Sequence, residues 1–200
     1  MLVKHLGLAD YEATWAAMQT FTARRGMDTP DELWILQHPP VYTVGLNGKP
    51  EHLPLDSPIP VIHIDRGGQI TYHGPGQIVA YLMVDLKRKG IGVRELVSRM
   101  EQSVIDLLSH YEIKGESRQN APGVYVDGRK IAALGLRIKH GCSYHGLSLN
   151  VDMDLGPFSA INPCGYPGLE VTQTKDLGIS DNLDMLDARL VATLEHHMGA

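Results

Sequence analysis

The sequence contains little cysteine and no long apolar run. Its 200 residues include two cysteines, Cys142 and Cys164, which could form at most one disulfide, and a chain of this size does not need one. No stretch approaches the roughly 20 uninterrupted apolar residues that cross a bilayer. The first residues lack the apolar core of a secretory signal. These absences predict a cytoplasmic protein with free thiols and no membrane partner.

An excess of charge of one sign is also absent. The 18 lysines and arginines against 23 acidic residues give a formal net charge of -5, and no stripe of basic and aromatic residues is visible. Such a chain is not expected to bind nucleic acid. The ten histidines show no short two-ligand spacing such as His-x-x-x-His. We therefore expect no metal site.

The apolar pattern predicts a single α+β domain over residues 1–200, with a mixed or antiparallel sheet packed by about three helices. The helices are expected near residues 10–25, 93–111 and 182–196. In the second helix, Val93 heads an apolar stripe that should face inward. The run Ile78 to Val84 is almost wholly apolar, so its strand should be covered on both faces. Residues 153–176 look like a loop.

A glycine-rich segment between two apolar strands is the first candidate site. Four glycines within residues 66–77 would expose backbone N–H groups and allow a ligand to approach the main chain. No Gly-Lys-Ser/Thr follows, so the segment is not a phosphate loop of the usual kind. A plain connection between strands is the alternative, but the polar side chains among the glycines favour binding. Those residues are Arg66, Gly67, Gly68, Gln69, Ile70, Thr71, Tyr72 and His73.

The two cysteines differ in their surroundings. Cys164 follows a proline and precedes a glycine in a loop, whereas Cys142 enters an apolar strand and is interpreted as a packing residue. Most lone cysteines are buried and inert, so sequence position alone leaves the role of Cys164 open.

Lys130 begins an apolar strand. Strand alternation places it on the same face as Ala132 and Leu134. A lysine on an apolar face needs a partner: beside a thiol its ammonium would stabilise a thiolate, and desolvation would let it carry protons. A solvated strand lysine is the alternative.

Four ordered segments together resemble the lipoyl(octanoyl) transferases. They are residues 66–77, Lys130 to Ile138, His145 to Val151, and Ile161 to Gly165. The resemblance covers nearly the whole chain. It implies the fold of the biotin and lipoate protein ligase catalytic domain, and an acyltransferase that needs no cofactor.

The resemblance also implies substrates and site residues. The donor would be an octanoyl-acyl carrier protein, and the acceptors would be lipoyl domains of 2-oxoacid dehydrogenase complexes and the glycine cleavage H protein. The catalytic pair would be Cys164 and Lys130. Substrate would bind along residues 66–73 and along Ala133, Leu134, Gly135, Gly146, Leu147 and Ser148. Ser148 stands where alanine is more usual in this family, which bears on chain-length preference.

Three other functions stay open. An ATP-dependent lipoate or biotin protein ligase would activate a free acid and need no cysteine nucleophile. A non-catalytic module would bind an acyl carrier without becoming acylated. A cysteine hydrolase would combine Cys164 with His73 or His145 and release free octanoate.

Overall fold

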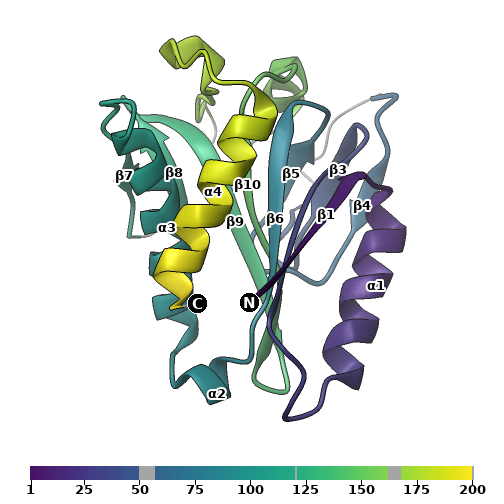
Figure 1. The fold of residues 1–200 in the computed structure, drawn as a ribbon. Coiled ribbons are helices and arrows are strands. Elements are labelled where there is room, and N and C mark those ends of the chain that lie inside the picture. The colour runs from purple at the N-terminus through teal and green to yellow at the C-terminus, as the bar shows by residue number, and fades with distance from the viewer. Residues whose placement is uncertain (50–56, 120, 162–167, 200) are drawn as a thin grey trace.

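A seven-stranded mixed sheet organises the chain, with helices on both of its faces (Figure 1). The computed structural model describes residues 1–49, 57–119, 121–161 and 168–199. The large sheet has the strand order β1-β2-β6-β10-β9-β8-β7, and a second sheet of three strands has the order β4-β3-β5. The strands are β1 (Leu2–Leu8), β2 (Glu32–Gln37), β3 (Val41–Val44), β4 (Val61–His63), β5 (Ile70–His73), β6 (Gln77–Met83), β7 (Glu116–Ser117), β8 (Gly123–Val126), β9 (Arg129–Lys139) and β10 (Cys142–Asn150).

The helices form the outer layers of the molecule. They are α1 (Tyr11–Arg24), α2 (Leu86–Lys89), α3 (Val93–Ser109) and α4 (Leu183–Met198), with short 3₁₀ helices at Gly156–Ala160 and Lys175–Leu177. Figure 1 shows α3 and α4 on one side of the large sheet, and α1 with the three-stranded sheet on the other. Among the described residues, no helix has both the length and the hydrophobicity required to span a membrane.

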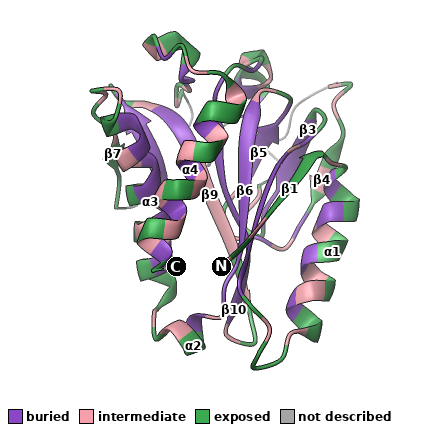
Figure 2. Cartoon of the chain, in the orientation of Figure 1, coloured by how far each residue is buried: buried purple, intermediate pink, exposed green. Residues whose placement is uncertain are grey.

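The two faces of the large sheet have different cores. Leucines of α3 and α4 pack against alternate residues of the central strands, such as Leu33, Ile78 and Leu149. Met18 of α1 packs against the intervening residues, which include Tyr81. Every residue of β6 is therefore buried, as Figure 2 shows. This confirms the prediction of a strand covered on both faces.

Most predicted elements are present, and a mixed sheet with three long helices confirms the predicted architecture. The sequence analysis missed β5, α2 and β7, because each has at most four residues and shows too little periodicity to detect. Val93 was expected to face inward, but its side chain is 44% exposed. Val93 is the first residue of α3, and the buried residues of this helix begin at Leu96.

A β-bulge in β9 changes the face on which Lys130 lies. Val124 of β8 pairs with Ala132, but the next residue, Tyr125, pairs with Lys130, so Ile131 is the extra residue. Val124, Ile131 and Ala132 all belong to the core under α3 and α4. Because paired residues share a face, Lys130 and Tyr125 point to the opposite side of the sheet. The prediction that Lys130 shares a face with Ala132 and Leu134 was therefore wrong.

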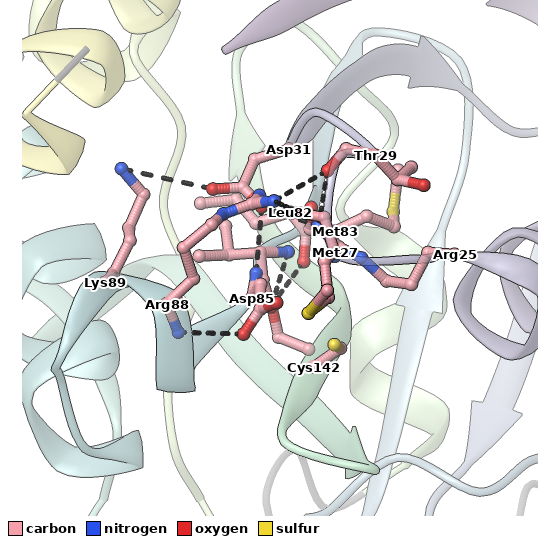
Figure 3. Close-up of polar contacts among 12 residues, drawn as sticks. Arg25, Met27, Thr29, Asp31, Leu82, Met83, Asp85, Arg88, Lys89 and Cys142 are labelled. Atoms are coloured by element: carbon pink, nitrogen blue, oxygen red, sulfur yellow. Dashed lines mark hydrogen bonds and ion pairs between the residues drawn. The ribbon is translucent and has the colours of Figure 1, made fainter.

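A buried carboxylate joins three elements at one end of the molecule (Figure 3). Asp31 precedes β2, and its Oδ1 accepts hydrogen bonds from Arg25 Nη2 at 2.7 Å and from Arg88 Nη2 at 2.6 Å. The backbone N–H of Asp85, which caps α2, donates to the same oxygen at 2.9 Å. Lys89 Nζ lies 4.0 Å from Oδ2. This cluster fastens the end of α1 and the start of α2 to the sheet.

We expect Asp31→Ala to lower the free energy of unfolding by about 3–5 kcal/mol, because it leaves the buried Arg25 guanidinium without its carboxylate. Urea denaturation measures the loss. Glu95→Ala is the control, because it breaks the solvent-exposed pair with Arg99 and should cost less than about 1 kcal/mol. Equal small losses in the two variants would contradict the structural role of Asp31.

Candidate functional site

A hollow lies between the large sheet and the three-stranded sheet. It contains about 480 Å³ of space not filled by atoms, part of it open to solvent. We call it the inner hollow. All the predicted substrate-binding residues except Gly67 and Tyr72 line it, namely Arg66, Gly68, Gln69, Ile70, Thr71, His73, Ala133, Leu134, Gly135, Gly146, Leu147 and Ser148.

Gly67 and Tyr72 lie beside the inner hollow rather than in its wall. The Gly67 N–H donates to the Leu136 carbonyl at 2.9 Å, which docks the glycine-rich segment onto β9. The alternation of β5 turns Tyr72 away, and its ring packs 5.5 Å from the rings of Tyr42 and Phe158. Conversely, the sequence analysis missed Tyr11, Val79 and Tyr81, which line the inner hollow.

Two glycines allow close approach in the wall of the inner hollow. A Cβ on Gly146 would lie 2.0 Å from the Ala80 carbonyl oxygen, and one on Gly135 would lie 2.8 Å from Arg66 Cδ. Arg66 can therefore cross the sheet at Gly135. Its Nη2 donates to the Thr43 carbonyl at 2.7 Å and to Thr43 Oγ1 at 2.9 Å, so the guanidinium is held as part of the wall.

Two buried histidines support the polar side of the inner hollow. His38 Nδ1 donates to the Ala9 carbonyl at 2.7 Å, and its Nε2 accepts from Tyr81 Oη at 2.7 Å. His73 Nδ1 donates to Gln77 Oε1 at 2.7 Å. Burial lowers the pKa of His38 to about 4 and that of His73 to about 3. Both imidazoles are therefore neutral at pH 7, with fixed tautomers.

A carboxylate that the sequence analysis missed organises another wall. Asp65 accepts hydrogen bonds from Trp15 Nε1 at 2.9 Å, from His145 Nε2 at 3.1 Å and from Tyr144 Oη. Burial tends to raise the pKa of Asp65, but the bonds from His145, Tyr144 and Trp15 outweigh it and hold the pKa well below its usual range. His145 has φ +61°, a left-handed conformation that lets consecutive side chains reach one carboxylate.

Lys130 is buried on the face of the large sheet that lies opposite α3 and α4. Its Nζ donates to the Pro122 carbonyl at 3.2 Å and lies 5.2 Å from the ring centroid of Tyr125. A Cβ on Gly123 would lie 3.2 Å from this Nζ, so glycine leaves room for the ammonium. The β9 bulge thus places a cation beside the inner hollow, on strand residues that continue into its wall at Ala133.

Cys164 lies outside the described residues, but the chain after it is placed. Glu170 and Thr172 form backbone hydrogen bonds of 2.9 Å with Lys130. A buried series continues from there: Asn150 Nδ2 donates to the Thr172 carbonyl at 3.0 Å, and Gln77 Nε2 donates to Asn150 Oδ1 at 2.9 Å. Because Gln77 also holds His73, this series connects residues 170–172 to the inner hollow.

Cys142 is a buried free thiol in β10, as the sequence predicts for a packing residue. Burial raises its pKa, so the thiol is a poor nucleophile at neutral pH. Within the part of the chain that the structure describes, no group of three or more histidine, cysteine, aspartate or glutamate side chains could hold a metal ion.

The neutral histidines predict a pH-dependent stability. Since the pKa of His38 is lower in the folded than in the unfolded chain, acid protonates the unfolded chain first, and stability falls as pH drops from about 6.5 towards 4. His38→Gln should remove up to about 1.4 kcal/mol of that loss per pH unit. Urea denaturation at pH 7, 6 and 5 measures it, with the exposed His63→Gln as control. A His38→Gln slope equal to that of the wild type would contradict the assignment.

Comparisons with known proteins identify the family of the chain. A sequence model of the lipoyl protein ligase A/B catalytic domain matches residues 10–195. The octanoyltransferase of Thiobacillus denitrificans is 61% identical over 195 residues, covering 98% of this chain and 89% of that protein.

Solved structures share the fold at low sequence identity. Lipoate-protein ligase A bound with ATP gives a TM-score of 0.80 at 13% identity, covering 100% of this chain and 86% of that one. Biotin protein ligase from Aquifex aeolicus, in complex with biotin and ATP, gives a TM-score of 0.64 at 11% identity, covering 99% of this chain and 70% of that one. The predicted fold is confirmed, and the chain belongs to the lipoyl protein ligase A/B catalytic domain family.

Proposed function

We propose that this chain is an octanoyltransferase that moves an octanoyl group from an acyl carrier protein to a lysine of a lipoyl domain. The placement of buried Lys130 beside the inner hollow carries the proposal. The relatives named octanoyltransferase support it. The acceptors would be lipoyl domains of 2-oxoacid dehydrogenase complexes and the glycine cleavage H protein.

In the first step the Cys164 thiolate attacks the carbonyl carbon of the octanoyl thioester. A new C–S bond forms, the bond to the carrier's pantetheine sulfur breaks, and Lys130 gives that sulfur a proton. In the second step the acceptor lysine amine attacks the acyl-cysteine. A C–N bond forms, the Cys164 thiolate leaves, and the amine's proton returns to Lys130. No ATP is needed, because the thioester is already activated.

The walls of the inner hollow suit an alkyl chain. Val79, Tyr81 and Ala133 line it, and each buried CH₂ of the substrate contributes about 0.8 kcal/mol. The bound alkyl chain would exclude water, which could otherwise hydrolyse the acyl-enzyme. Ser148 also lies in this wall, so its hydroxyl would bear on the preferred chain length. The thiolate must stay reduced, which fits a reducing compartment such as the cytoplasm.

Intact-mass spectrometry tests the proposal. After mixing with octanoyl-carrier protein and no ATP, the chain should gain one octanoyl group, and added apo lipoyl domain should then take it. Cys164→Ala should gain nothing, whereas the matched control Cys142→Ala should be acylated. A dependence on ATP would indicate a ligase, free octanoate a hydrolase, and binding without acylation a non-catalytic module. Each of these results would contradict the proposal.

Lys130→Met should slow acylation of Cys164 by at least about 100-fold, since the variant can neither favour the thiolate nor supply the proton. Rapid-quench mass spectrometry measures the rate over a range of pH. We expect the loss to shrink as pH rises and the thiol ionises without help. A rate near that of wild type would contradict the role of Lys130.

A further inference from the structure

Two further hollows share lining residues with the inner hollow or with each other. The middle hollow shares Gly68, Gln69, Leu134 and Gly135 with the inner hollow. The outer hollow shares Val93, Val97 and Pro122 with the middle one, and extends to the first turns of α3 and to β7. Each hollow therefore shares part of its wall with the next.

Lys130 lies next to the residue that the middle and outer hollows share at their junction. Its Nζ donates to the carbonyl of Pro122, the residue at which the middle and outer hollows meet. A thioester reacting beside Lys130 would extend its acyl chain into the inner hollow. The rest of the donor, its pantetheine arm, would then leave along the outer hollow.

The side chains of the outer hollow match the chemistry of that arm. Val93 and Val97 offer apolar contact, and Ser98, Ser117 and Gln119 offer hydrogen bonds to amides. Such a mixture suits a chain that carries two amides and a dimethyl group between its thiol and its phosphate.

Two exposed arginines line the outer hollow, Arg94 on α3 and Arg118 after β7. The Arg118 guanidinium stacks 4.1 Å from the Tyr125 ring centroid and donates to the Gly128 carbonyl at 3.3 Å, so it is pre-positioned with N–H groups to spare. The acidic residue there, Glu101, accepts from the Gly123 N–H at 2.9 Å and interacts electrostatically with Lys130.

We propose that the outer hollow binds the phosphopantetheine arm of the acyl donor, with Arg94 and Arg118 on its phosphate. The inference rests on the proposed octanoyl transfer and adds a recognition site to it. Arginine suits this task because its planar fork of N–H donors matches phosphate oxygens. The positive end of α3 adds to the attraction.

Two small donors test the proposal, octanoyl-pantetheine and octanoyl-phosphopantetheine, which differ only in the phosphate. The measured quantity is the ratio of kcat/KM for the phosphorylated donor to that for the other. In the double variant Arg94→Gln, Arg118→Gln this ratio should fall about tenfold. Arg24→Gln is the matched control, an exposed arginine at the end of α1 on the other side of the large sheet, and should keep the ratio.

The possible results are distinct. A ratio that falls only in the double variant supports the phosphate site. If the double variant keeps the wild-type ratio, the phosphate site is overturned, even if the rates with both donors fall. Arg118 would then act through Tyr125 and Lys130. A loss seen only with octanoyl-carrier protein also overturns it, since the arginines would contact the carrier's surface. Failure of the wild-type chain to transfer from any donor would refute the proposed function, and this inference with it.

Discussion

The burial of one lysine is the constraint on which the site depends. An ammonium cannot remain among the leucines of α3 and α4 without a large desolvation cost. In β9 the extra residue Ile131 takes the core position instead, and Lys130 turns to the face that carries the inner hollow. There Pro122 and Tyr125 offer a carbonyl and a ring face to the ammonium, and Gly123 leaves space for it. The bulge therefore keeps the ammonium out of the apolar core and places it on the face that carries the inner hollow.

The other titratable groups of the site each have a defined charge state. His38 and His73 are buried and neutral, and each is fixed in one tautomer by a backbone or amide partner. Asp65 stays ionised because hydrogen bonds from His145, Tyr144 and Trp15 outweigh the effect of its burial. With the histidines uncharged, the cations at this site are Lys130 and Arg66 among the described residues. Such an environment favours an anion beside Lys130, which a nucleophilic thiolate requires.

The sequence predicted the architecture well because long periodic segments identify their own elements. The lining of the inner hollow was predictable where it consists of consecutive residues, as in 68–71. Three features were not predictable. The bulge at Ile131 leaves no mark on an apolar strand, and Asp65 gains its role only from partners up to 80 residues away. Tyr72 required the register of β5, a strand too short to show its alternation.

Crystallography of the octanoylated chain tests the account most directly. We expect density for an octanoyl chain joined to Cys164 Sγ and running into the inner hollow past Thr71, Val79 and Ala133. Lys130 Nζ should lie within hydrogen-bonding reach of the thioester. An acyl group attached to another residue, or a chain that lies outside the inner hollow with Lys130 distant from the thioester, would contradict the account.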